Sequence, residues 1–252
     1  MIAKYCALVL ALSTFPYTQR LFFMSSGNVT QANAAQTIEV IHGEGEPSHA
    51  VIWLHGLGAS SDDFPPVVPY LGLDKARTIR FIFPQAPNRP ITINGGMEMP
   101  GWYDIKGMSI ADKEDLVGMT ESKNTLDSLI DEQVALGISS ERIIVAGFSQ
   151  GGAVAYYTGI RSPHKLAGIL ALSTYLPFAT EAKVQQSSVN TESPILAMHG
   201  LHDQVVPLVL GKGSSDVLAS LGYSVEWKTY PMEHSVIPEQ LVDIGHWINR
   251  IF

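Results

Sequence analysis

Six short, largely apolar runs recur along the chain, separated by longer stretches with helical spacing. They are AVIWLHG (50–56), TIRFIFP (78–84), RIIVAGF (142–148), LAGILALS (166–173), PILAMHG (194–200) and SVEWKTY (224–230). Strands buried on both faces belong to parallel sheets that helices cover on both sides. The pattern therefore predicts an α/β protein with a mostly parallel central sheet flanked by helices on both faces. The alternating run TIEVIH (37–42) is typical of an edge strand.

Two of the intervening stretches predict helices with an apolar stripe. The first lies between residues 112 and 136 and ends before Gly137, a favoured helix stop; its stripe is Leu126, Leu129, Ile130 and Val134. The second spans residues 238–252 and begins with Pro238, a favoured first-turn residue; its stripe is Leu241, Ile244, Ile248 and Ile251. No internal repeat or linker interrupts the alternation, so we expect residues 37–252 to form a single domain.

Composition limits the kinds of partner. The 252 residues are 46% hydrophobic and 16% charged, which is ordinary for a globular protein with a core. A net charge of −8, with no cluster of Lys or Arg, argues against nucleic acid as a partner and against a polybasic membrane anchor. Cys6 is the only cysteine, which excludes an intramolecular disulfide and a multi-cysteine metal site.

Residues 1–36 form an N-terminal extension with two interpretations. An early lysine, an apolar run and the small-x-small triplet ANA (32–34) suit an export signal. Pro16 and Arg20 interrupt that run, and the cleavage candidate lies well beyond it. A start at Met24, with a cytoplasmic protein, is the expectation that we favour, and export is the alternative. Outside this segment, no other stretch approaches the roughly 18 apolar residues of a membrane span.

The segment GFSQG, residues 147–151, has the pattern G-x-S-x-G between a predicted strand and a predicted helix. This is the setting of a nucleophile elbow, in which a strained turn exposes the serine and the glycines avoid clashes. A serine hydroxyl needs a neighbouring base to act as a nucleophile. Ser149 therefore predicts an acid and a histidine in later loops.

Both partners follow later predicted strands. Asp203 comes after PILAMHG and His234 after SVEWKTY. Because the carboxyl ends of parallel strands meet at one edge of a sheet, we expect Ser149, Asp203 and His234 to converge as a catalytic triad. In HGLGASSDDF (55–64) the glycines allow close backbone approach, which makes the amides of Leu57 and Gln150 candidates for an oxyanion hole.

The metal and dinucleotide alternatives are weaker. His199, His202 and Asp203 lack the helical H-x-x-H arrangement of a metal site, and the GLGASS loop lacks the third glycine of a dinucleotide fingerprint. We expect His55 to brace its loop through hydrogen bonds. The Pro- and Gly-rich loop from Pro84 to Asp104 carries apolar side chains that either line a site or fold back onto the core.

Six motifs together resemble the acyl-protein thioesterase/carboxylesterase (lysophospholipase-like) family from about Ala50 to the C-terminus. They are HGLG, GWYD, GFSQGGAVAYYTGI, LAGILALSTYLP, HGLHDQVVP and YPMEHSV. The resemblance implies an α/β-hydrolase fold without a large cap domain, and a serine hydrolase of carboxylic esters or thioesters. It places the family's nucleophile, acid and base on Ser149, Asp203 and His234, and its oxyanion amides on Leu57 and Gln150.

The resemblance also implies an acyl-binding surface at Met99, Trp102, Tyr175 and Leu176, where Tyr175 takes a position often held by tryptophan. It implies no metal or organic cofactor. The expected partner is an acyl substrate, which is a small ester, a lysophospholipid or an S-acylated protein, and a homodimer is possible for a chain of this family. Two alternatives stay open from the residues, namely a non-catalytic binding protein and a peptidase on the same fold.

Overall fold

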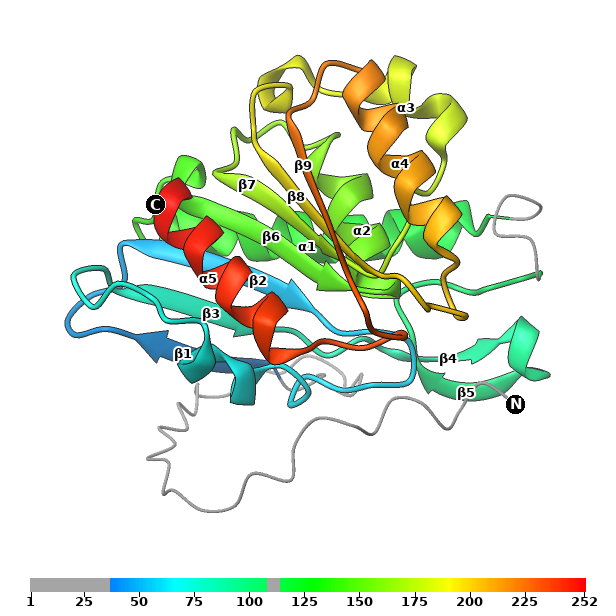
Figure 1. The fold of residues 1–252 in the computed structure, drawn as a ribbon, viewed down its shortest axis with the longest axis horizontal. Helices are drawn as coiled ribbons and strands as arrows, with labels where there is room; N and C mark the ends of the chain where they lie inside the picture. The colour runs from blue at the N-terminus through cyan, green and yellow to red at the C-terminus, as the bar shows by residue number, and fades with distance from the viewer. Residues whose placement is uncertain (1–36, 108–113) are drawn as a thin grey trace, which may run out of the picture.

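The computed structural model describes residues 37–107 and 114–252. A seven-stranded sheet runs through the molecule in the order β1-β3-β2-β6-β7-β8-β9, and only β1 is antiparallel to its neighbour (Figure 1). The prediction of a mostly parallel sheet is confirmed. The strands are β1 (Ile38–His42), β2 (His49–Leu54), β3 (Ile79–Phe83), β6 (Ile143–Phe148), β7 (Gly168–Leu172), β8 (Ile195–Gly200) and β9 (Val225–Tyr230).

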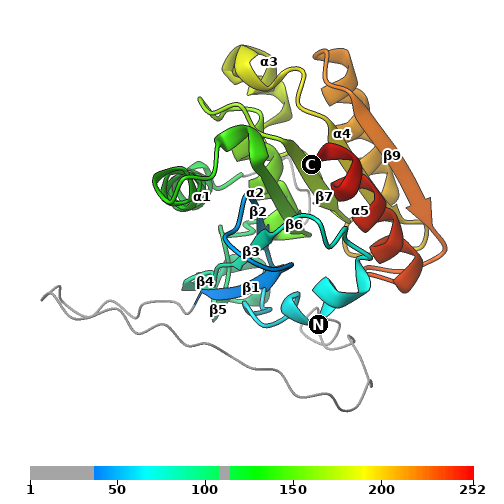
Figure 2. The ribbon, with the colours of Figure 1, turned by 90° about the vertical axis from the view of Figure 1, so that its left-hand side faces the viewer.

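Helices cover both faces of the sheet, as the apolar strands require (Figure 2). Alternate β2 residues enter different cores: Ile52 and Leu54 face one, and Val51 and Trp53 face the other. The first core is closed by α1 (Leu116–Ala135), α2 (Gln150–Gly159), α3 (Ala179–Gln185) and α4 (Leu208–Ser220). The second is closed by α5 (Pro238–Ile251) and the 3₁₀ turn η1 (Pro65–Tyr70).

The predicted helical stripes are largely buried. Leu126 and Ile130 of α1 are in the core, whereas Val134 near its end is 39% exposed. Gly137 adopts a φ of +95° just after α1, which is the left-handed conformation expected at a helix stop. In α5 the residues Leu241, Ile244 and Ile248 are buried.

Two predictions about local structure were wrong. SVEWKTY was expected to be a buried strand, but β9 lies at the edge of the sheet and most of its residues are only half-buried. The segment from Pro84 to Asp104 was expected to be a loop, but it contains a small hairpin of β4 (Asn88–Ile91) and β5 (Met97–Pro100), with the turn η2 (Thr92–Asn94) between them. Local apolar content does not report whether a strand has neighbours on both sides, which explains the first error.

Candidate active site

Ser149 occupies a sharp turn between β6 and α2. Its φ of +54° lies in a region that non-glycine residues rarely adopt, so the turn is strained. The flanking glycines are needed sterically: a Cβ on Gly147 would lie 2.2 Å from the backbone carbon of Gly151, and one on Gly151 would lie 2.5 Å from the carbonyl oxygen of His55. The Ser149 N–H donates to the carbonyl of Leu172 at 2.9 Å, which ties the turn to β7.

Three side chains that are far apart in sequence form one hydrogen-bonded chain. His234 Nε2 lies 2.9 Å from Ser149 Oγ, and His234 Nδ1 lies 2.7 Å from Asp203 Oδ2. The ionised carboxylate can only accept, so Nδ1 carries the proton and Nε2 is free to accept from the serine hydroxyl. In this tautomer the imidazole is ready to take the proton of Ser149.

The carboxylate of Asp203 is fixed from both ends. Its side chain is fully buried, and Oδ1 accepts hydrogen bonds from the backbone N–H groups of Val205 and Val206 at 2.9 and 2.8 Å. His199 Nε2 lies 3.5 Å from Oδ2 and 2.8 Å from the carbonyl oxygen of Val206. These contacts orient the carboxylate toward His234, and sequence reasoning did not anticipate them.

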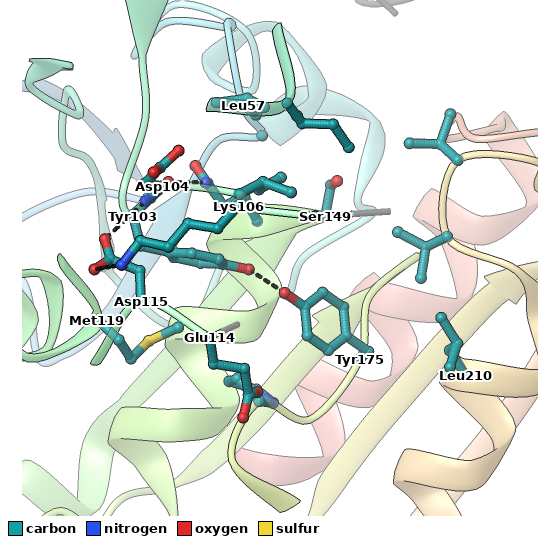
Figure 3. A pocket seen from close by; sticks show the side chains of 18 of the residues that line it. Leu57, Tyr103, Asp104, Lys106, Glu114, Asp115, Met119, Ser149, Tyr175 and Leu210 are labelled. Atoms are coloured by element: carbon teal, nitrogen blue, oxygen red, sulfur yellow. Dashed lines mark hydrogen bonds and ion pairs between the residues drawn. The ribbon is translucent and has the colours of Figure 1, made fainter. Parts of the chain in front are cut away.

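The two amides predicted for an oxyanion hole lie beside Ser149. Leu57 and Gln150 both line the same pocket as Ser149, in which Figure 3 labels Leu57 and Ser149. A Cβ on Gly56, the residue before Leu57, would lie 3.5 Å from the Cβ of Ser149. Neither backbone N–H donates a hydrogen bond to another described residue. Two unpaired N–H donors next to a nucleophile are suited to hold a developing negative charge.

The side chain of Gln150 connects the elbow to the hairpin segment. Its Oε1 accepts from the N–H of Trp102 at 2.8 Å, and its Nε2 donates to the carbonyl of Tyr103 at 2.6 Å. The indole N–H of Trp102 in turn donates to the carbonyl of His55 at 2.8 Å. These bonds lock the loop that carries Leu57 against the nucleophile.

His55 braces this loop, in agreement with the prediction. The backbone N–H of Ala86 donates to His55 Nε2 at 3.1 Å, so Nδ1 carries the proton and donates to the carbonyl of Gly56 at 2.7 Å. Burial lowers the pKa of His55, and the bond to Gly56 opposes that shift. The buried imidazole is therefore neutral and acts as a structural link.

A cavity of about 380 Å³ opens beside Ser149 and His234. Tyr175 lines it, but the other three residues expected to bind the acyl group do not. Trp102 and Leu176 are buried in the core, and the sulfur of Met99 accepts a hydrogen bond from Asn94 Nδ2 at 3.4 Å. An acyl-binding role for these three residues stays a prediction, which the lining of this cavity does not support. The indole N–H of Trp102 donates to the carbonyl of His55, which holds this side chain in the core.

No group of three or more His, Cys, Asp or Glu side chains in the described residues is arranged to hold a metal ion. Among the same residues, no helix combines the length and the apolar character needed to cross a membrane. The elbow, the hydrogen-bonded Ser-His-Asp chain and the parallel sheet together define a hydrolase of the α/β-hydrolase class.

Comparison with known proteins gives the family. A model of the phospholipase/carboxylesterase family matches residues 35–252, and the chain belongs to this family. It is 38% identical to an acyl-protein thioesterase 1 of Gibberella zeae over 209 residues, which cover 79% of this chain and 89% of that protein. It is 42% identical to an acyl-protein thioesterase 1 homolog of Dictyostelium discoideum over 81% of this chain and 90% of the relative.

A solved structure shows the same fold. The crystal structure of Zea mays acyl-protein thioesterase 2 superposes with a TM-score of 0.77 at 28% identity, covering 86% of this chain and 99% of the maize chain. The expected α/β-hydrolase fold and the family resemblance are therefore confirmed.

Proposed function

We propose that the protein hydrolyses acyl thioesters and carboxylic esters through an acyl-enzyme formed on Ser149. The observation that carries the proposal is the hydrogen-bonded chain from Ser149 Oγ through His234 to Asp203. It supplies a nucleophile, a base with the required tautomer and a group that stabilises the imidazolium.

In the first half-reaction, Ser149 Oγ attacks the acyl carbonyl carbon while its proton moves to His234 Nε2. The N–H groups of Leu57 and Gln150 donate to the oxyanion of the tetrahedral intermediate. As this intermediate collapses, the C–S or C–O bond breaks and His234 returns the proton to the leaving thiolate or alkoxide. The products are the free thiol or alcohol and the acyl-enzyme.

In the second half-reaction, water enters the position that the leaving group vacated. His234 takes a proton from this water, which attacks the acyl carbonyl, and then gives the proton to Ser149 Oγ as the ester bond breaks. The acid product leaves and the enzyme is regenerated.

The finer substrate is a proposal too. The relatives named acyl-protein thioesterase favour an S-acylated protein, and a lysophospholipid or a small ester offers the same reacting carbonyl. We assign the activity to a single catalytic domain of residues 37–252. Residues 1–36 lie outside the described residues, so a cytoplasmic location stays a prediction, with export as the alternative. A homodimer is a separate prediction.

The experiment compares the wild type with Ser149→Ala on a matched oxygen ester and thioester, a lysophospholipid and a peptide amide. We expect the variant to lose about 10³-fold or more in kcat/KM on the ester and thioester, and to lose labelling by a fluorophosphonate. Its melting temperature should stay close to that of the wild type. Retention of turnover by a folded Ser149→Ala protein would exclude Ser149 as the nucleophile, and a preference for the amide would indicate a peptidase.

A further inference from the structure

The side chain of Thr174 donates a hydrogen bond to the backbone of the nucleophile turn. Its Oγ1 lies 2.6 Å from the carbonyl oxygen of Ser149. Thr174 follows the carboxyl end of β7 and is buried. The same carbonyl oxygen accepts from the N–H of Ala153 at 3.1 Å, in the first turn of α2. The carbonyl of Ser149 therefore has two donors, and one of them comes from the neighbouring strand rather than from the helix.

Two features hold Thr174 in this position. Ser173, the residue before it, adopts a φ of +47°, which non-glycine residues rarely do, and its N–H donates to the carbonyl of Met198 at 2.8 Å. A Cβ on Gly152 would lie 2.7 Å from the Cγ2 of Thr174, so the methyl group of this threonine packs directly on the backbone of α2. With the methyl group placed there, the hydroxyl is directed at Ser149. Strained turns that are fixed in this way concentrate at functional sites.

The carbonyl that Thr174 holds belongs to the same peptide unit as the N–H of Gln150. A peptide unit is planar and trans, so its C=O and N–H groups point in opposite directions. A donor that fixes the oxygen of Ser149 therefore also fixes the direction of the N–H of Gln150. Because Gln150 is the first residue of α2, its N–H has no partner within the helix and is free to donate to a substrate.

The hydrogen bond from Thr174 also makes this N–H a stronger donor. A peptide unit that accepts at its oxygen becomes more polarised, and each bond in such a chain strengthens the next by about 10–30%. Thr174 is 4% exposed and Gln150 is 3% exposed, so water screens the chain little. An oxyanion bound to the N–H of Gln150 would be the final acceptor of this chain.

We propose that Thr174 is a positioning residue for the oxyanion hole: its hydroxyl orients and polarises the peptide unit between Ser149 and Gln150, whose N–H then stabilises the tetrahedral intermediate. Thr174 is not among the residues that line the cavity, so it acts through this peptide unit and not on the substrate. The inference rests on the proposed function, because the oxyanion forms only when Ser149 attacks an acyl carbonyl.

The test compares Thr174→Val, which removes the hydroxyl and keeps the shape of the side chain, with Thr174→Ser, which keeps the hydroxyl. In Thr174→Val the carbonyl of Ser149 still has the N–H of Ala153 as a donor, so we expect the protein to fold. Loss of a whole oxyanion donor costs about 10²–10³-fold in kcat, and a weakened donor should cost less. We expect kcat/KM on p-nitrophenyl butyrate to fall about tenfold in Thr174→Val and to stay within about threefold of the wild type in Thr174→Ser.

A second measurement reports on the oxyanion itself. Butyl trifluoromethyl ketone should react with Ser149 Oγ to form a hemiketal, and its fluorine NMR signal should titrate as the hemiketal oxygen ionises. Weaker donation by the N–H of Gln150 disfavours the ionised form, so the pKa of the hemiketal should rise by about one unit in Thr174→Val. A loss of fold stability alone would leave this pKa unchanged.

Thr78→Val is the matched control. Thr78 is buried and its Oγ1 donates to the carbonyl of Glu44 at 2.5 Å, so the substitution removes the same kind of hydrogen bond. Thr78 precedes β3 and lies at the amino end of the parallel strands, whereas Ser149 follows the carboxyl end of β6. This variant should keep the wild-type kcat/KM and hemiketal pKa. Melting temperatures establish that each variant is folded.

A wild-type kcat/KM or an unshifted hemiketal pKa in folded Thr174→Val would overturn the inference. Equal losses in Thr174→Ser and Thr174→Val would overturn it as well, because the hydroxyl would then have no part in the effect. Failure of the proposed function is a separate result, which would appear as turnover that survives in Ser149→Ala.

Discussion

Replacement of Asp203 separates the two tasks of its carboxylate. One oxygen accepts from the backbone N–H groups of Val205 and Val206, and the other accepts from His234 Nδ1. Asparagine keeps only one acceptor oxygen. If that oxygen stays with the two amides, the new NH₂ group faces His234, where it can only donate.

The consequence for the reaction follows from the tautomer. An NH₂ group opposite Nδ1 forces this nitrogen to accept, so the proton moves to Nε2. His234 then donates toward Ser149 and can no longer take its proton. We expect Asp203→Asn to lose about 10⁴-fold in kcat/KM, which equals about 5 kcal/mol of transition-state stabilisation.

Asp203→Ala should lower kcat/KM by a similar factor, and it should also lower the free energy of unfolding. It removes the acceptor for both amides. The N–H of the half-exposed Val205 can turn to water, whereas that of the buried Val206 is left unpaired. One unpaired buried donor costs about 1–3 kcal/mol, so the alanine variant should unfold more easily than the asparagine variant by about that amount.

The assay pairs kcat/KM on p-nitrophenyl butyrate with the free energy of unfolding from urea titration. Asp216→Asn serves as the control, because this carboxylate is exposed on α4 and, among the residues that the structure describes, pairs with Lys212 alone. A folded Asp203→Asn protein within tenfold of the wild-type rate would refute the assignment of Asp203 as the acid. Equal stabilities of Asp203→Asn and Asp203→Ala would refute the role given to the two amide bonds.

Three further predictions concern the elbow and two buried titratable groups. Gly147→Ala should lose at least about 100-fold in kcat/KM, because its Cβ would displace the elbow backbone; Gly213→Ala, which has open space around it, should keep the wild-type rate. Burial lowers the pKa of His55, so folding disfavours its protonated form and the free energy of unfolding falls as pH drops below about 6.5. An NMR titration of the folded protein should find the pKa of this imidazole below the value of about 6.5 for a free histidine, and a pKa at or above that value would contradict this. Burial, together with the charge of Asp62, raises the pKa of Asp63 to about 6, so its ionised form destabilises the fold increasingly as pH rises from about 4 to 6. Asp63→Asn should therefore raise the free energy of unfolding by about 1 kcal/mol at about pH 8, after allowance for partial exposure, and leave it unchanged at about pH 4. Equal changes in melting temperature at both pH values would show that ionisation of Asp63 is not the cause.

Much of the architecture could be predicted from short-range patterns. The apolar runs marked the strands, and the G-x-S-x-G segment marked the turn between β6 and α2. The edge position of residues 38–42 followed from alternation. The same reasoning failed for β9, whose neighbours are determined by the order of the sheet, and for the hairpin of β4 and β5, whose pairing is not encoded in any single periodic run.

The candidate site was predictable to the extent that topology determines it. Ser149, Asp203 and His234 each follow a strand of one parallel sheet, and the carboxyl ends of these strands lie at the same edge. The support around them was not predictable: the bonds from the Gln150 side chain to Trp102 and Tyr103 join residues more than forty positions apart in the chain, and no local pattern relates them.

The sequence by itself determined the class of fold and the residues proposed for the chemistry, because strand burial, the elbow glycines and the order of the three side chains are local or topological properties. The family followed from the resemblance of six motifs. Only the tertiary structure decided which side chains line the cavity. The indole ring of Trp102 lies in the core, where its N–H donates to the carbonyl of His55, a residue 47 positions earlier in the chain. Tyr175 faces the cavity with its hydroxyl bonded to Tyr103, a residue 72 positions earlier in the chain. Side-chain direction in loops depends on such long-range hydrogen bonds, and local periodicity carries no record of them.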